Sequence, residues 1–157
     1  MPDPSVSTGA PPADAIVLGF DVGSRRIGVA VGSAPGGARA VAVVDVHAAG
    51  PDWKALDRLH GEWRPRGLMV GDPLTLDGGD QPIRRRARAF AHELKARYRL
   101  PVVMVDERSS SIEAAQRFAR ERAAGNRRRR DAEALDAAAA AVIIERWLSA
   151  PDNATPL

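Results

Sequence analysis

Residues 18–31 of the chain read L-G-F-D-V-G-S-R-R-I-G-V-A-V, two apolar runs separated by a short polar turn. Apolar runs of this length that are bounded by turn residues predict buried β-strands. The first run ends in one carboxylate, Asp21, and burying a bare carboxylate costs free energy unless a cation or hydrogen bonds compensate it. Two explanations of Asp21 stay open at this point. It faces a metal ion, or it accepts backbone hydrogen bonds from Gly23 and Ser24 as a turn former.

The pattern on both sides of this hairpin predicts an α/β domain. The predicted strands are 15–21, 26–32, 39–46, 68–71 and 102–106, and the predicted helices are 51–63, 83–98, 109–122 and 131–148. Short links that contain glycine or proline join the first three strands, as antiparallel neighbours require. The later strands alternate with helices, so we expect a mixed sheet covered by helices.

Length and composition indicate a single domain with no disulfides. The chain has 157 residues, which is enough for one core, and no cysteine, which excludes disulfides and thiolate metal sites. No apolar stretch is long enough to predict a membrane span, and the start lacks a signal-peptide pattern. We expect a disordered tail over 1–14, a folded domain over 15–149 and a disordered tail over 150–157.

The basic residues are clustered, and this distribution is more informative than the net charge of +3. Nearly all of them are arginines, which raises the sequence pI to about 10.1. One cluster comprises Arg84, Arg85, Arg86 and Arg88, and a second one covers 127–130. Such clusters suit contacts with phosphates, although a solvated charged surface is the alternative.

Acidic residues end the first and last predicted strands and lie in the first turns of the last predicted helix. They are Asp21, Asp106 with Glu107, and Asp136. If the two strands are parallel, their carboxyl ends meet at one edge of the sheet, where α/β proteins form their sites. Mg²⁺ or Mn²⁺ relieves the repulsion between converging carboxylates, and two such ions assist phosphodiester hydrolysis. Alternatively, Arg108 pairs with Asp106 or Glu107, and Asp136 is a surface acid near the helix N-terminus.

Four segments, taken together and in order, resemble one protein family. They are G-F-D-V-G-S-R-R-I-G-V-A-V-G, V-G-D-P-L-T-L-D-G, V-V-M-V-D-E-R-S-S-S-I-E-A-A and L-D-A-A-A-A-A-V-I-I-E-R-W-L. This set is similar to the YqgF family of Holliday-junction-resolvase-like proteins, nucleases of pre-16S rRNA, over 16–148. The resemblance implies a ribonuclease H-like fold. Its five-stranded mixed sheet has three antiparallel strands, then two parallel ones, and helices on both faces. It also implies a cytoplasmic enzyme that matures the 5′ end of 16S rRNA.

Carried over residue by residue, the resemblance implies a catalytic set that also binds metal. Asp21, Glu107 and Asp136 are expected to hold Mg²⁺ or Mn²⁺ in a two-metal mechanism. The arginines that we expect to contact nucleic acid are Arg25, Arg26, Arg84, Arg85, Arg108, Arg127, Arg128, Arg129 and Arg130.

One loop departs from the family pattern. It usually reads Gly-Leu-Pro, whereas this chain has Asp72 between Gly71 and Pro73. Asp72 is either a fourth metal ligand or, as we favour, a loop residue that caps its own turn. Glu133, three residues before Asp136, is either an auxiliary ligand or an acid that complements the helix dipole.

Three other functions are compatible with parts of the pattern. A resolvase that cuts four-way DNA junctions keeps the fold and normally acts as a dimer. An rRNA-binding assembly factor of the ribosomal particle keeps the surface but not the catalysis. The D-V-G-S segment also resembles the phosphate-binding turn of sugar kinases and actin-type ATPases, which need two such domains. We predict no membrane partner, and both a monomer and a homodimer remain compatible with the sequence.

Overall fold

The computed structural model describes 11–12, 14–34, 36–73, 82–106 and 131–157, with only the helical backbone at 131–134 and 136. The strands are β1 Val17–Val22, β2 Arg26–Ser33, β3 Gly37–His47, β4 Gly50–Pro51, β5 Gly67–Asp72, β6 Val102–Asp106 and β7 Thr155–Pro156. The helices are α1 Trp53–Trp63, α2 Pro82–Tyr98 and α4 Asp131–Ser149, with a short 3₁₀ helix η1 at Pro151–Asn153.

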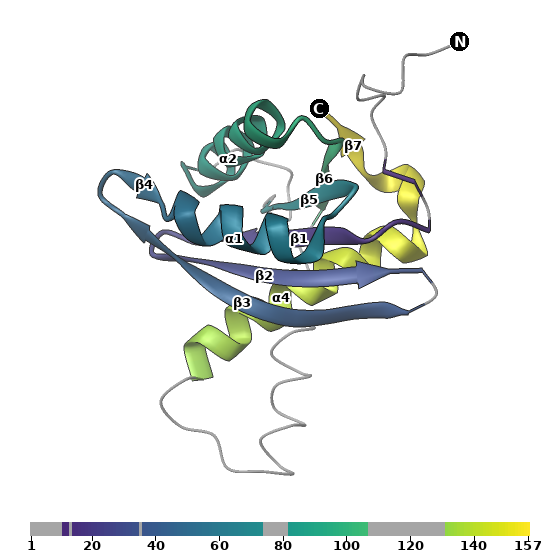
Figure 1. Ribbon diagram of the computed structural model, residues 1–157, viewed down its shortest axis with the longest axis horizontal. Coiled ribbons are helices and arrows are strands. Elements are labelled where there is room, and N and C mark those ends of the chain that lie inside the picture. The colour runs from purple at the N-terminus through teal and green to yellow at the C-terminus, as the bar shows by residue number, and fades with distance from the viewer. Residues whose placement is uncertain (1–10, 13, 35, 74–81, 107–130) are drawn as a thin grey trace.

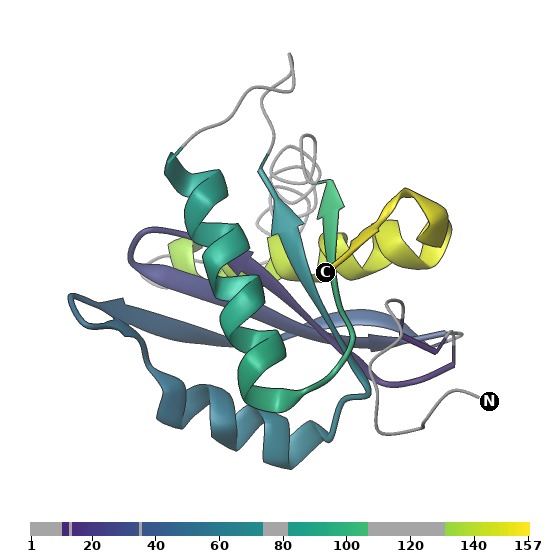
Figure 2. The same ribbon diagram turned by 90° about the horizontal axis from the view of Figure 1, so that it is seen from above.

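All seven strands belong to one mixed sheet in the order β4-β3-β2-β1-β5-β6-β7. β1, β2 and β3 form an antiparallel meander, and β5 and β6 add to β1 in parallel. α1 and α2 cover one face of the sheet, and α4 crosses the other (Figures 1 and 2). The expected α/β fold, with three antiparallel strands, then two parallel ones, and helices on both faces, is confirmed. The two-residue edge strands β4 and β7 extend the expected five-stranded sheet to seven strands.

Each face of the sheet has its own core, because alternate strand residues point to opposite faces. On the face of α1 and α2, Leu18 and Phe20 of β1 belong to the α2-side cluster, which also contains Leu56 of α1 and Phe90 of α2. On the other face, Val17 belongs to a cluster that includes the apolar residues of α4. This separation determines which strand-end side chains lie near α4 and which lie near α2.

The C-terminal residues correct our expectation of a disordered tail over 150–157. η1 follows α4, and Thr155 of β7 pairs with Met104 at the edge of the sheet. Leu157 donates its backbone N–H to the carbonyl of Val102 at 3.0 Å, and its own carbonyl accepts from Lys95 Nζ. The sequence missed this strand because a two-residue edge strand has no periodicity of its own.

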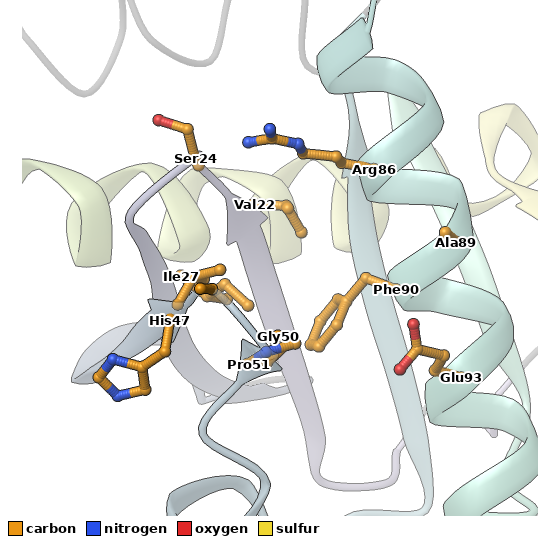
Figure 3. A pocket seen from close by; sticks show the side chains of 13 residues that line it. Val22, Ser24, Ile27, His47, Gly50, Pro51, Arg86, Ala89, Phe90 and Glu93 are labelled. Atoms are coloured by element: carbon orange, nitrogen blue, oxygen red, sulfur yellow. The ribbon is translucent and has the colours of Figure 1, made fainter.

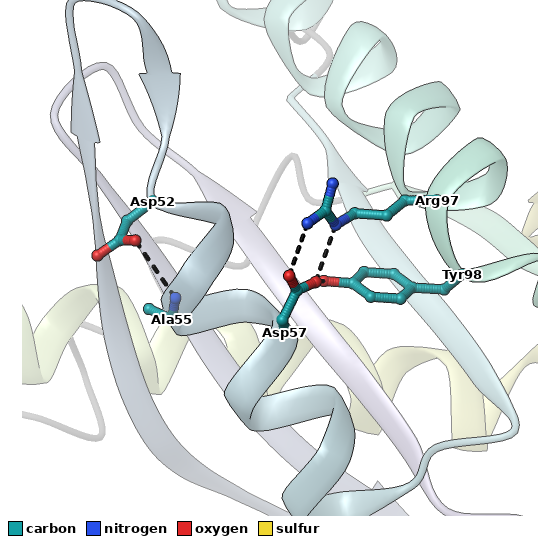
Figure 4. Close-up of polar contacts among 5 residues, drawn as sticks. All are labelled: Asp52, Ala55, Asp57, Arg97 and Tyr98. Atoms are coloured by element: carbon teal, nitrogen blue, oxygen red, sulfur yellow. Dashed lines mark hydrogen bonds and ion pairs between the residues drawn. The ribbon is translucent and has the colours of Figure 1, made fainter.

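A charged network ties α1 to α2 (Figure 4). Arg97 donates two hydrogen bonds to the Asp57 carboxylate, at 2.8 and 2.6 Å, and the Tyr98 hydroxyl donates a third at 2.7 Å. The Arg97 guanidinium also lies 5.0 Å from the ring centroid of Trp53, and the His60 ring stacks on Tyr98. Because these bonds favour the carboxylate, first those from Arg97 and then that from Tyr98, they hold the pKa of Asp57 well below its usual range.

The network predicts an acid-dependent part of the stability. A lowered pKa stabilises the fold above the unfolded-state pKa of about 4, and this contribution is lost as the pH falls below it. We therefore expect Asp57→Asn to be less stable than the wild type at pH 7 and to lose less stability between pH 4 and pH 2. Urea midpoints across this range measure the effect, with exposed Asp152→Asn as the control. Equal pH slopes for Asp57→Asn and wild type contradict the prediction.

Candidate active site

Asp21 lies at the carboxyl end of β1, on the face of the sheet that α4 covers. It alternates with Val17, a member of the α4 cluster, and with Gly19, which lies directly against α4. Asp21 is half-buried and pairs in register with Gly28 of β2. The Gly23 N–H donates to the carbonyl of Arg26 at 2.9 Å, so this donor closes the β1–β2 turn itself. The turn-former explanation of Asp21 therefore loses one of its two expected donors.

α4 passes close to β1 because glycine leaves room for it. A Cβ placed on Gly19 would lie 2.6 Å from Ile144 Cγ1 and 3.1 Å from the carbonyl oxygen of Ala140. Asp136 lies four positions before Ala140, about one helical turn, and its side chain is outside the described residues. The backbone of the predicted third acid is thus on the helix that packs over the face of Asp21.

Asp72 forms an ion pair with α2 that the sequence did not predict. It is the last residue of β5, and its carboxylate accepts hydrogen bonds from Arg84 Nε at 2.9 Å and Arg84 Nη2 at 3.4 Å. Its side chain is 11% exposed and that of Arg84 17%, so the ion pair is largely shielded from water. Asp72 alternates with Leu68 and Val70 of the α2-side cluster, which places it on the opposite face from Asp21. It connects the end of β5 to the start of α2. The loop that its carboxylate was expected to cap lies outside the described residues from position 74 onwards.

This ion pair predicts a loss of stability when one partner is removed. Asp72→Leu leaves the Arg84 guanidinium without this acceptor, which is expected to cost about 1–3 kcal/mol of unfolding free energy. Adding Arg84→Met should recover part of that loss, because an apolar pair leaves no uncompensated charge in its place. Urea denaturation of both single variants and the double variant measures the coupling. Strictly additive effects would show that the pair contributes nothing.

The predicted nucleic-acid arginines divide into three groups. Arg25 and Arg26 lie at the β1–β2 turn beside Asp21, and the Arg25 carbonyl accepts the Val46 N–H at 2.8 Å. On α2, Arg85 is exposed, whereas Arg84 bonds to Asp72. Arg108, Arg127, Arg128, Arg129 and Arg130 lie outside the described residues.

The donor chemistry at Asp21 fits the divalent ions that we predicted. Carboxylate oxygens are the ligands that Mg²⁺ and Mn²⁺ prefer. Within the described part of the chain, no three His, Cys, Asp or Glu side chains form a metal-binding group. Of the three predicted ligands, Glu107 lies outside that part and Asp136 is described only by its backbone. The ligand set thus stays a prediction, in which Asp21 is the member with a known position.

Comparison with known proteins identifies the family. A sequence model of the RuvX family, described as Holliday junction resolvase, matches residues 15–150. The chain belongs to the RuvX family. A relative from Xanthomonas campestris pv. campestris (strain B100), named "Putative pre-16S rRNA nuclease", is 76% identical, and the match covers 95% of this chain and 97% of the relative. A relative of the same name from Xanthomonas oryzae pv. oryzae (strain PXO99A) is 76% identical over 92% of this chain and 94% of its own.

Solved structures show the same fold for this RuvX family member. Thermus thermophilus RuvC in complex with a Holliday junction substrate aligns with a TM-score of 0.54 at 17% identity, covering 90% of this chain and 99% of that one. A second T. thermophilus RuvC structure aligns with a TM-score of 0.51 at 18% identity and the same coverage. The predicted membership of the YqgF family, the ribonuclease H-like fold and the enzyme class of nuclease are confirmed.

Arg86 is a candidate residue of this RuvX family member that its sequence does not single out. Arg86 of α2 belongs to the basic cluster that the sequence shows, but we did not include it among the residues expected to contact nucleic acid. It lines a cavity beside the β1–β2 turn together with Ser24. Within a run of three consecutive arginines, the sequence alone does not distinguish the one that faces a cavity.

No helix in the described ranges is long and apolar enough to cross a membrane.

Proposed function

We propose that the protein is a metal-dependent nuclease that processes the 5′ end of pre-16S rRNA in the cytoplasm. The observation that carries the proposal is the position of Asp21, half-buried at the carboxyl end of β1 on the face covered by α4. The names of relatives that are 76% identical over nearly the whole chain support the choice of substrate.

In this proposal Asp21, Glu107 and Asp136 hold Mg²⁺ or Mn²⁺. When bound, such ions supply an activated water and stabilise the charge that develops on the phosphate. The half-buried position of Asp21 orients its carboxylate and limits its hydration. Arg25 and Arg26, at the adjoining turn, hold the phosphate of the substrate. Water adds to phosphorus as the bond to the 3′ oxygen breaks, which leaves a 5′-phosphate and a 3′-hydroxyl.

A resolvase of four-way DNA junctions is the second candidate, and the description of the family model favours it. Single-turnover cleavage with Mg²⁺ or Mn²⁺ separates the two, using labelled pre-16S 5′ RNA and a labelled four-way DNA junction. We expect cleavage of the RNA by the wild type. Cleavage of the junction alone would replace our proposal with the resolvase. If neither is cut while RNA remains bound, the protein acts as an assembly factor or requires the ribosomal particle.

The basic segment 127–130 predicts a salt-dependent contribution to RNA binding. Removing one arginine that binds a phosphate should reduce the slope of log affinity against log salt by about 0.7 for single strands. We therefore expect replacement of all four arginines by glutamine to weaken binding and flatten this slope by up to about 3. Fluorescence anisotropy at several salt concentrations measures it.

A matched control removes positive charge elsewhere on the surface. Lys54 and Arg58 are exposed on α1, and neither is among the residues that we predict to contact nucleic acid. Their replacement by glutamine should therefore change the slope little. If the two sets of substitutions flatten the slope equally per charge, segment 127–130 has no specific contact with phosphate.

A further inference from the structure

A cavity of about 500 Å³ lies between α2 and the turns at one end of the sheet. Its lining comes from the β1–β2 turn, from the end of β3 with β4, and from one side of α2 (Figure 3). This volume lies within the range of small-molecule sites in proteins. The cavity is distinct from the Asp21 face, because its residue Val22 belongs to the α2-side cluster.

The floor of the cavity is apolar and rigid. Val22, Ile27 and Phe90 contribute to it, and all three are buried in the α2-side cluster. The Phe90 ring packs edge-on against Phe20 at a centroid distance of 5.4 Å and stacks on Trp53 at 5.7 Å. Because two aromatic neighbours already hold the Phe90 ring in place, a planar ligand can contact this floor without the entropy cost of ordering it.

The rim is polar, and its charges are segregated. Arg86 extends from α2 towards Ser24 of the β1–β2 turn, and Glu93 lies beyond Phe90 at the opposite end of the lining (Figure 3). Arg86, Ser24 and Glu93 are all exposed. The cation and the hydroxyl at one end suit a phosphate, and the apolar floor suits the plane of a base. The carboxylate at the other end suits an amino group of that base.

We propose that this cavity binds one unpaired nucleotide of the RNA substrate. Arg86 and Ser24 hold its phosphate, the floor contacts the base, and Glu93 accepts a hydrogen bond from an exocyclic amino group. RNA is recognised mainly through unstacked bases in this manner. The inference rests on the proposed function, for which it specifies a single-stranded segment next to the cleavage site.

The cavity lies close to the Asp21 face along the chain. Val22 and Ser24 follow Asp21 closely in the chain, and alternation places Val22 and Asp21 on opposite faces of β1. A nucleotide in the cavity is therefore separated from the Asp21 face by the end of one strand. A base-paired segment cannot insert one base there without unpairing it, so the cavity selects substrates with a single-stranded segment.

A cavity-filling variant tests the proposal without catalysis. Ala89 is exposed on α2 and lines the cavity, so Ala89→Phe should fill it, while exposed Ala96 on the same helix does not line it. The ligand is a single-stranded RNA hexamer with one internal 2-aminopurine, titrated in EDTA and followed by its fluorescence. We expect about tenfold weaker binding for Ala89→Phe and unchanged binding for Ala96→Phe. Thermal melting verifies that both variants are folded.

Two arginine variants distinguish a specific contact from general charge. Arg86→Ala and Arg88→Ala remove the same charge from neighbouring exposed positions of α2, but only Arg86 lines the cavity. We expect Arg86→Ala to weaken hexamer binding several-fold more than Arg88→Ala. Glu93→Gln should reduce the ratio of the affinity for a cytidine hexamer to the affinity for a uridine hexamer, because cytosine has an exocyclic amino group and uracil has none.

The outcomes separate this inference from the proposed function. If Ala89→Phe binds the hexamer like the wild type, the cavity is not a nucleotide site, even where the wild type cleaves pre-16S RNA. If Ala89→Phe loses binding while the wild type cleaves no RNA, the nucleotide site stands and the proposed nuclease activity fails. Equal losses for Arg86→Ala and Arg88→Ala would overturn the assignment of Arg86.

Discussion

Asp21→Asn is expected to lower the rate of RNA cleavage by more than about 100-fold. Even groups that only support metal ligands commonly change activity by about 10–100-fold, so replacement of a ligand should exceed this. Asparagine keeps the shape of the side chain but removes the negative charge that attracts a divalent ion. Because Asp21 is half-buried at a strand end, the same change should leave the fold intact. Single-turnover cleavage in saturating Mg²⁺ or Mn²⁺ measures the effect.

A control variant at another carboxylate tests whether the loss of cleavage is specific to Asp21. Asp14, just before the folded strands, is exposed, and Asp14→Asn should cleave RNA at the wild-type rate. Thermal melting of both variants then separates loss of catalysis from loss of folding. Turnover by Asp21→Asn within a factor of a few of the wild type would exclude Asp21 as a metal ligand.

Gly19→Val should lower the stability of the fold by overpacking the contact between β1 and α4. A Cβ at Gly19 would already lie 2.6 Å from Ile144 Cγ1 and 3.1 Å from the backbone oxygen of Ala140. Ile144 is fully buried, so neither neighbour can move without shifting α4 away from β1. Overpacking of this kind costs about 1–3 kcal/mol, which corresponds to a fall of roughly 2–12 °C in the melting temperature. Differential scanning calorimetry measures it.

Gly61 provides a matched glycine control. It lies in α1, is exposed, and has no atom within 4 Å of an added Cβ. Gly61→Ala should therefore raise stability by about 0.5–1 kcal/mol, because alanine loses less conformational entropy in a helix. A Gly19→Val variant as stable as the wild type would show that α4 is not held against β1 as the structure describes.

The longer strands and the described α-helices were accessible from the sequence because their patterns are local. The predicted helix 109–122 lies outside the described residues. The apolar runs around Asp21 predicted β1 and β2 to within two residues of their observed ends, and the predicted helix 83–98 matches α2 except for its first residue. Periodicity and turn chemistry act over a few residues, which makes them readable without knowledge of the fold. The choice of Asp21 as a candidate also came from its place at the end of an apolar run.

The partners of the strand-end acids depended on the tertiary structure. Sequence alone did not show that Asp72 bonds Arg84 on the opposite face from Asp21. The sequence also did not show which arginine of the run 84–86 lines a cavity, whereas the structure shows that it is Arg86. Whether two charged residues meet depends on strand register and on which helix covers which face, and a shift of one residue reverses the face.

The sequence by itself therefore determined the order of the five longer strands and of the described α-helices, the fold class and the family. Only the tertiary structure decided that α4 covers the Asp21 face, that Asp72 bonds Arg84 at the junction of β5 and α2, and that the C-terminal residues extend the sheet. The physical reason is the range of the interactions. Backbone propensity and apolar periodicity are set by near neighbours, whereas ion pairs, close helix approach and edge-strand pairing form only between segments distant in the chain.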